Sequence, residues 1–302
     1  MAVLALAALA LGACGADEPA QPQVEGRGCE GQERNIGAFD AGRACRDVRR
    51  MVAFGPRPAG SAANERQARY LAGRLEEAGV RDVGIQKPWR NVVGRIPGTE
   101  DGAIVIGAHV DTKDIDGFVG ANDGASGAAV VLELARSVQA PFDGPELRFA
   151  LFDAEEARGD RDFDDDGLRG SRQYVAQAAE GRGQGGDLGD VRAMVLFDMV
   201  GDCSLQIPRE RNSDSELYGA FAGRPFGGET GPIGDDHIPF LEREIPAVDL
   251  IDFTYGSDDS PGPFWHTTQD TLDKVCRSSL DEVGEAAIRA LPRLAEVAAR
   301  PR

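Results

Sequence analysis

The chain has 302 residues, of which 41% are hydrophobic and 28% are charged, a composition typical of a globular protein with a sizeable core. Acidic residues outnumber basic ones by 51 to 33, which gives a formal net charge of −18 at pH 7. This excess argues against a nucleic-acid binder, whose binding face would be basic, and against electrostatic docking on anionic lipid. Only 3 histidines are present, so their positions are the first place to look for chemistry.

The amino terminus has the pattern of an export signal. Residues 1–13 are apolar, end in small residues and are too short to span a bilayer. The segment LGAC at residues 11–14 resembles the bacterial lipobox, in which the cysteine is acylated after cleavage, although the usual basic segment before it is missing. A plain signal peptide with an incidental Cys14 is the alternative. Residues 14–41 are rich in Gly, Pro and acidic residues and are predicted to be a flexible tether. We therefore expect an exported lipoprotein of the bacterial cell envelope, held at the membrane by its lipid alone.

Four cysteines follow Cys14, and export would permit disulfides between them. They are Cys29, Cys45, Cys203 and Cys276. None has the close Cys–Cys spacing of a cysteine zinc site. The sequence does not fix the pairing. A Cys29–Cys45 bond would form a clip on the tether, and four buried free thiols are the alternative.

Residues 42–302 are predicted to form one α/β domain. The segment 55–61 is interpreted as a turn before a helix over residues 64–78, which Gly79 ends. The strands expected next are Asn91–Ile96, Ala103–Ala108, Leu147–Phe152, Ala193–Phe197 and Ala247–Ile251, and the helices are Gly127–Val138, Arg172–Ala179 and Leu280–Ala299. Apolar strands that alternate with helices indicate a mostly parallel sheet covered by helices on both faces. Residues 207–231 are predicted to be a polar, Gly-rich loop at a pocket rim.

Histidines and carboxylates follow four of these strands at their carboxyl ends, where open α/β sheets bind ligands. They are His109, Asp111, Asp153, Glu155, Glu156, Asp198 and, in the loop after the last strand, His266, with Asp123 before a helix. One acidic residue at a strand end is commonly a turn residue. Convergence of so many, with two histidines, predicts a zinc centre, because imidazole and carboxylate are typical zinc ligands. In the pair Glu155-Glu156, one carboxylate can bind metal while the other acts as a general base.

Four segments carry a resemblance to a known family: HVDTKDIDGFVGANDGASGAAVVLELAR, LFDAEEA, LFDMVGD and WHTTQDTLD. In order and spacing they resemble the zinc-dependent aminopeptidases typified by bacterial leucyl aminopeptidase, and the glutaminyl cyclases that share their fold. The resemblance spans roughly residues 42–297. It implies one catalytic domain with a mixed sheet, flanking helices and zinc at the carboxyl ends of the strands.

The resemblance also implies a role for each matching residue. The implied ligands are Asp123, Glu156 and His266 for a first zinc, with His109 and Asp198 for a second. Glu155 matches the general base. Aminopeptidases hold two metals that share the match to Asp123. Cyclases bind one zinc, and their match to Asp198 hydrogen-bonds near the substrate instead. The resemblance therefore implies one or two zinc ions and does not fix the number.

Two features resemble the cyclases rather than the aminopeptidases. The segment 235–237 reads Asp-Asp-His, and Asp235 matches a member of the cyclase hydrogen-bond network. Trp265 matches a tryptophan wall of the glutamine pocket. Two features depart from animal cyclases. Asp249 stands where they have a histidine, although bacterial cyclases of that type also look acidic there, and the acidic loop 158–168 lacks their tryptophan.

We therefore expect a zinc-dependent glutaminyl-peptide cyclotransferase that converts N-terminal glutamine to pyroglutamate and releases ammonia. Its catalytic residues would be Glu155, Asp198 and Asp235, and its substrate contacts Trp265 and Asp249. A zinc aminopeptidase of the same family is the alternative, and a catalytically inactive binding lipoprotein is a third interpretation. The partners would be peptide or protein N-termini, and we expect a monomer.

A second metal is a separate hypothesis. Residues 162–167 match the D-x-D-x-D-G opening of a calcium loop, which would bind Ca²⁺ through Asp162, Asp164 and Asp166. The twelfth position is Gln173 instead of the usual bidentate glutamate. A solvated acidic loop is the alternative.

Overall fold

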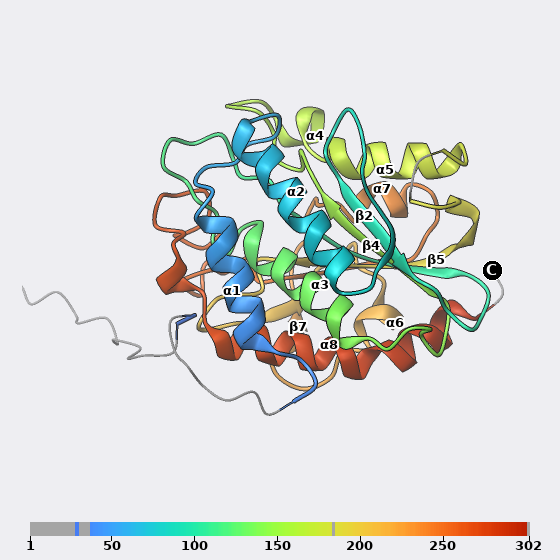
Figure 1. The fold of residues 1–302 in the computed structure, drawn as a ribbon. Coiled ribbons are helices and arrows are strands. Elements are labelled where there is room, and N and C mark those ends of the chain that lie inside the picture. The colour runs from blue at the N-terminus through green and yellow to red at the C-terminus, as the bar shows by residue number, and fades with distance from the viewer. Residues whose placement is uncertain (1–27, 30–36, 183–184, 301–302) are drawn as a thin grey trace, which may run out of the picture.

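The computed structural model describes residues 28–29, 37–182 and 185–300, which are organised around a six-stranded sheet (Figure 1). In spatial order the strands are β1 (Arg81–Ile85), β2 (Val92–Ile96), β4 (Glu146–Phe152), β3 (Ala103–His109), β5 (Val191–Asp198) and β8 (Ala247–Ile251). β1 and β2 pair antiparallel, as do β2 and β4, and the remaining neighbours are parallel. The predicted mostly parallel sheet is confirmed.

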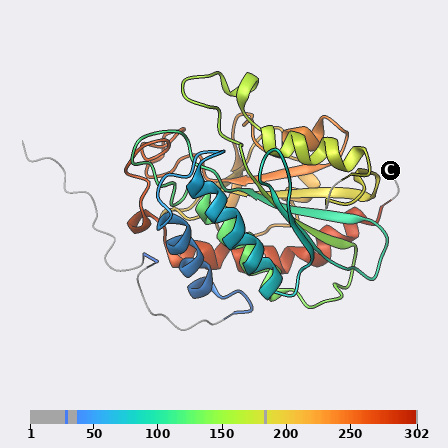
Figure 2. The same ribbon diagram turned by 45° about the horizontal axis from the view of Figure 1, so that its top comes forward.

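Helices cover both faces of this sheet (Figures 1 and 2). One layer contains α1 (Ala41–Val52), α2 (Ala62–Glu77), α3 (Ala125–Ser137) and α8 (Arg277–Ala298), and the other contains α5 (Arg169–Ala179) and α7 (Ile238–Leu241). The larger apolar core lies under the first layer. Under the second layer the rings of Phe152, Tyr174 and Phe240 meet, with centroids 5.7 to 6.3 Å apart. Burial on both faces explains why the central strands are mostly apolar.

Local sequence signals explain how the helices start and pack. The Ser61 side chain accepts a hydrogen bond from the backbone N–H of Asn64 and caps α2. Gly124 has a φ of +86° where the chain turns into α3. A Cβ on Gly127 would lie 2.0 Å from the carbonyl oxygen of Phe197, so α3 reaches β5 only because this residue is glycine.

The prediction of a plain loop over residues 207–231 is wrong. This segment contains β6 (Ile207–Arg209), α6 (Ser215–Tyr218) and β7 (Phe226–Glu229), and β6 pairs with β7 in parallel. The Phe226 ring packs against Phe221 and Tyr218, with centroids 5.3 and 6.4 Å away. Elements of three or four residues are too short to show a periodic pattern. The remaining short elements are α4 (Phe163–Asp166), η1 (Leu188–Asp190) and η2 (Leu272–Lys274).

Two disulfides join the four cysteines in the described part of the chain. Cys29 bonds to Cys45 in α1, and Cys203 bonds to Cys276 just before α8. The Cys29–Cys45 pair is therefore confirmed, and the alternative of four free thiols is wrong. Disulfides form and persist in oxidising compartments, which indicates an exported protein.

The predicted tether spans residues 14–41, and the structure describes residues 28–29 and 37–41 of it, which pack on the domain. Cys29 and Phe39 are both buried in the main core. The predicted signal peptide and Cys14 lie in residues 1–27, outside the described residues. Among the described helices, none combines the length and apolarity needed to cross a membrane.

Candidate metal centre and active site

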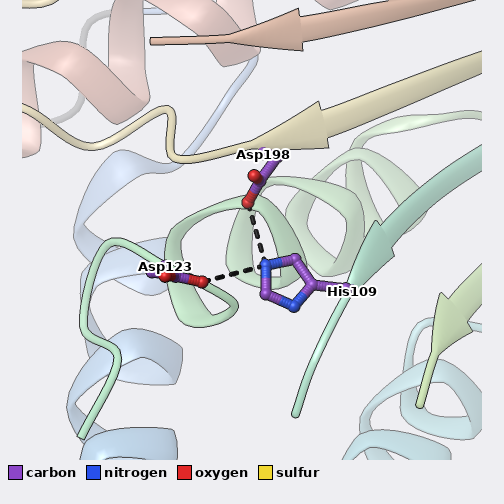
Figure 3. A group of neighbouring side chains, drawn as sticks. All are labelled: His109, Asp123 and Asp198. Atoms are coloured by element: carbon purple, nitrogen blue, oxygen red, sulfur yellow. Dashed lines mark hydrogen bonds and ion pairs between the residues drawn. The ribbon is translucent and has the colours of Figure 1, made fainter. Parts of the chain in front are cut away.

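The fold gathers the predicted metal ligands at one edge of the sheet. His109 is the last residue of β3 and Asp198 the last of β5, while Glu155 and Glu156 follow β4. Figure 3 shows the side chain of Asp123, from the loop before α3, pointing toward His109. His266 completes this set of side chains and lies in the loop after β8. These strands are parallel neighbours, so their carboxyl ends bring residues distant in sequence to one place.

The ligands form two groups that share Asp123. One contains His109, Asp123 and Asp198, the other Asp123, Glu156 and His266, and the possible ligand atoms in each group lie within 4.8 Å of one another. The Nε2 atom of His109 is 3.0 Å from Asp198 Oδ1 and 3.2 Å from Asp123 Oδ1. The Nε2 atom of His266 is 2.9 Å from Glu156 Oε1 and 3.6 Å from Asp123 Oδ2.

These residues fit zinc. An imidazole nitrogen carries at most one hydrogen, so His109 Nε2 cannot donate to both carboxylates that lie beside it. The other Asp123 oxygen, Oδ2, is buried without a hydrogen-bond partner. A cation between these atoms would satisfy all of them at once. Two imidazoles and three carboxylates are donor types that zinc accepts.

Two buried aspartates hold the ligand-bearing backbone. Asp111 accepts hydrogen bonds from the backbone N–H groups of Glu155 and Glu156, at 3.1 and 3.4 Å. Asp270 accepts one from the N–H of Asp123 at 3.0 Å and another from the neighbouring N–H at 2.8 Å. The Tyr255 hydroxyl donates to Asp270 at 2.7 Å. Such partners fix the orientation of metal ligands.

The backbone is strained beside the ligands. Ala154, Met199 and His266 have φ values of 58°, 49° and 52°, in the left-handed region that non-glycine residues rarely adopt. Ala154 precedes the predicted base Glu155, Met199 follows the predicted ligand Asp198, and His266 is itself a predicted ligand. Such conformations cost about 1–3 kcal/mol each and persist where the surroundings enforce them, commonly at functional sites.

Burial and neighbouring charges shift the acid–base properties of the centre. Burial raises the pKa of Glu155 well above its usual range, and the charge of Glu156 adds to the effect. Burial opposes charge on His109, but Asp198 and hydrogen bonds outweigh it, so the pKa of His109 is raised. Burial also opposes charge on Asp123, yet its hydrogen bond to His109 lowers its pKa. Asp123 is thus kept ionised, while Glu155 is a stronger proton acceptor than an exposed glutamate.

Asp235 and Asp249 form an acidic group behind the ligands. Asp235 lines the pocket, and burial together with the charge of Asp198 raises its pKa well above the ordinary value. Asp249 is fully buried in β8 and does not line the pocket; burial and the charge of Asp235 raise its pKa strongly too. Neighbouring buried carboxyls cannot all ionise, so this group retains protons. A direct substrate contact by Asp249 stays a prediction.

His237, the third histidine, lies away from the metal groups. It is fully buried, and its Nε2 lies 3.3 Å from Oε1 of Glu210. Glu210 Oε2 also accepts hydrogen bonds from the backbone N–H groups of Asn212 and Ile233, at 2.8 and 3.1 Å. This pair therefore supports the segment that leads to Asp235.

A pocket of about 360 Å³ opens over the centre, with metal ligands on one side and apolar walls on the other. Trp265 lies in its wall and stacks on the His266 ring, with centroids 3.9 Å apart and planes 20° apart. The lining residues that sequence analysis missed are Lys113, Phe163, Pro232, Ile233, Gly234, Ile251 and Phe253. Phe163 was hidden because it lies within a run of aspartates. Lys113 lies four residues after His109 in the sequence, and its Nζ lies 3.6 Å from Oε2 of Glu156.

The structure does not support the calcium hypothesis. Asp162 caps the four-residue helix α4 by accepting a hydrogen bond from the N–H of Asp164. The Asp166 carboxylate accepts hydrogen bonds from Arg158, Arg161 and Arg169. Arginines therefore occupy the oxygens of Asp166, one of the three predicted calcium ligands. In the described ranges, both groups that could hold a metal lie at the sheet edge.

Residues 91–291, about two thirds of the chain, match the profile of peptidase family M28. The chain belongs to this family. The predicted family resemblance is thus confirmed.

Similar proteins include both kinds of M28 relative. Glutaminyl-peptide cyclotransferase from Bos taurus is 27% identical over 244 residues, covering 66% of this chain and 64% of that protein, so the M28 chain spans less than two thirds of its length. The crystal structure of a glutaminyl cyclase from an Acidobacteriales bacterium has a TM-score of 0.75 and 29% identity, covering 87% of this chain and 97% of that one. A Zn-dependent exopeptidase from Parabacteroides distasonis has a TM-score of 0.72 and 25% identity, covering 88% of this chain and 100% of that one.

Proposed function

We propose that this M28 protein is a zinc-dependent glutaminyl cyclase that converts N-terminal glutamine to pyroglutamate and releases ammonia. The observation that carries the proposal is the buried Asp235 carboxyl in the pocket wall, whose pKa is raised by burial and by the charge of Asp198. Asp235, together with Asp198 in the same pocket lining, can hold a substrate amine without a second metal. The similar cyclases from Bos taurus and the Acidobacteriales bacterium support the same choice.

In this mechanism Asp123, Glu156 and His266 would hold zinc, which would supply Lewis-acid polarisation of the side-chain carbonyl of the substrate glutamine. Glu155 accepts a proton from the α-amine as the amine nitrogen bonds to the carbonyl carbon of the side-chain amide. Glu155 then returns the proton to the side-chain nitrogen as the old C–N bond breaks and ammonia leaves. Asp198 and Asp235 orient the amine. No water enters the reaction.

An aminopeptidase is the second candidate, and the complete group of His109, Asp123 and Asp198 favours it. This group offers a second metal position beside the first, as two-metal hydrolases require. Glu155 would then accept a proton from water, and the resulting hydroxide would attack the first peptide carbonyl. The similar Zn-dependent exopeptidase from Parabacteroides distasonis supports this candidate.

A paired assay separates the candidates. Purified zinc-loaded protein is given N-terminal glutaminyl and N-terminal leucyl peptides, and ammonia and free leucine are measured. Ammonia with pyroglutamate is the expected result, whereas free leucine alone would select the peptidase. Glu155→Gln is expected to lose at least 100-fold in kcat with its zinc retained. Glu229→Gln, at an exposed ion pair, is the matched control and should keep wild-type activity. A wild type that binds zinc but acts on neither peptide would indicate a binding protein.

We also propose that a lipid on Cys14 anchors the protein to the membrane and that the protein is a monomer. Cys14→Ser in the full chain is expected to move the protein from the membrane fraction to the soluble fraction of the expressing bacterium. An unchanged distribution would exclude the anchor. Light scattering of the soluble variant would test the monomer.

A further inference from the structure

The acidic loop of residues 158–168 presents an aromatic side chain to the pocket. Phe163 is half-buried and lines the pocket, while Asp162 and Asp164 on either side of it are exposed. A methyl group on Gly167 would lie 2.8 Å from the Phe163 ring, and one on Gly234 would lie 3.5 Å from it. The ring is therefore held between its own loop and the segment that leads to Asp235, in the wall of the pocket.

Asp166 organises this loop from within. It is buried although its chain neighbours Asp164 and Asp165 are exposed. Its carboxylate accepts hydrogen bonds from the backbone N–H of Arg158 at 2.8 Å and from Nη2 of the same residue at 2.5 Å. Arg161 donates to it at 3.2 Å, and Arg169 forms a further close contact. One carboxylate thus joins both ends of the loop.

Arg169 connects this arrangement to the metal centre. Its Nη2 donates a hydrogen bond to the backbone carbonyl oxygen of Glu156 at 2.9 Å, and its guanidinium lies 4.9 Å from the centre of the Trp89 ring. Asp166, Arg169 and Glu156 form a continuous chain of contacts. The position of Phe163 is therefore fixed relative to a predicted zinc ligand.

We infer that Phe163 is a specificity-determining residue for the substrate's second residue, and that Asp166 is the positioning residue that sets it. The reactive end of a substrate must reach the buried ligands, so the next residue lies toward the mouth, against Phe163. The aromatic wall selects peptides whose second residue is apolar. This assignment of the second-residue subsite rests on the proposed action at peptide N-termini.

The test compares two peptides that differ only in leucine or glycine at the second position, with glutamine or leucine first according to what the wild type accepts. We expect the wild type to prefer the leucine peptide by about tenfold in kcat/KM, the usual scale of one apolar contact. Phe163→Ala is expected to abolish the preference by raising KM, with kcat nearly unchanged, because this contact exists before and during reaction. Phe163→Trp, which keeps an aromatic ring at this position, should retain the preference for the leucine peptide. A Phe163→Ala enzyme with the wild-type preference would overturn the inference.

The positioning role is tested separately. Asp166→Asn is expected to lose most of the preference while retaining zinc, and Asp164→Asn, an exposed acid of the same loop, should match the wild type. If Asp166→Asn folds poorly, Arg158→Gln is the second variant. It changes an exposed side chain and removes only the side-chain contacts of Arg158 to Asp166, so it should also raise KM for the leucine peptide. Wild-type KM ratios in both variants would refute the role of Asp166. A wild type that accepts only leucyl substrates would contradict the cyclase proposal and leave this test intact.

Discussion

Replacing Arg57 with methionine tests whether one buried charge shapes the metal-binding loop. Arg57 is fully buried, and its guanidinium donates to the backbone carbonyls of Val110, Val119 and Gly120. Val110 directly follows the ligand His109, and the other two residues lie just before the shared ligand Asp123. Hydrogen bonds from a charged group contribute about 1.5–3 kcal/mol each. Burial, only partly offset by nearby aspartates, lowers the pKa of Arg57 to about 10, which corresponds to a cost of roughly 3 kcal/mol for the buried charge.

The difference between these opposing effects sets the expected result. Arg57→Met preserves much of the side-chain volume, so the loss should come from the unpaired carbonyls and not from a cavity. We expect the free energy of unfolding, from urea titration of the metal-free protein, to fall by about 2–5 kcal/mol. Zinc affinity, measured by competition with a chelator, should fall at least tenfold as Asp123 loses its fixed position. Arg66→Met, at an exposed arginine, is the control. A stability change under about 0.5 kcal/mol with unchanged zinc affinity would refute this reasoning.

Three further variants follow from contacts at and behind the centre. Asp270→Asn places an N–H donor against the backbone N–H of Asp123. Zinc affinity in the same competition assay should therefore fall about 10–100-fold. An unchanged affinity would contradict the positioning role of Asp270. Burial opposes charge on Glu210, but hydrogen bonds, with that of His237 the largest, lower its pKa to about 2. The ionised Glu210 carboxylate therefore contributes stability above pH 4.5, and this contribution is lost as the pH falls toward 2. The urea midpoint of the wild type should exceed that of Glu210→Gln by less at pH 3 than at pH 6. An equal difference at both pH values would argue against this role of Glu210. Cys276→Ser opens a bond that spans 73 residues and should lower the free energy of unfolding by about 2–5 kcal/mol, whereas equal urea midpoints would exclude a stabilising role.

The centre could be located from the sequence because its ligands follow apolar strands. The runs before His109, Glu155 and Asp198 are short and mostly apolar, which is the pattern of central parallel strands. Parallel neighbours end at the same edge, so strand order was not needed to expect convergence. The structure then adds the distances, and with them the two groups that share Asp123.

The residues that support the ligands could not be predicted in the same way. Arg57 lies in a segment interpreted only as a turn, and its partners are backbone carbonyls more than 50 residues away. Asp270 acts on backbone N–H groups near Asp123, a contact that leaves no local pattern. Phe163 was masked by its acidic neighbours, whose spacing suggested calcium. Long-range contacts to backbone atoms depend on the folded path of the chain, and no periodicity records them.

The sharing of Asp123 between the two ligand groups has a consequence for metal occupancy. Asp123 Oδ1 lies near His109 and Oδ2 near His266, so a cation at one position would help to orient the carboxylate for the other, while two cations would repel each other. Binding at the two positions is therefore thermodynamically linked, and the influence of each on the other is equal in size. If zinc binds at both positions, the number of zinc ions per chain would depend on zinc concentration and on the balance of this coupling, with no change in the ligands. One unaltered set of side chains can thus exist in singly and doubly loaded forms, which a zinc titration would resolve as one step or two.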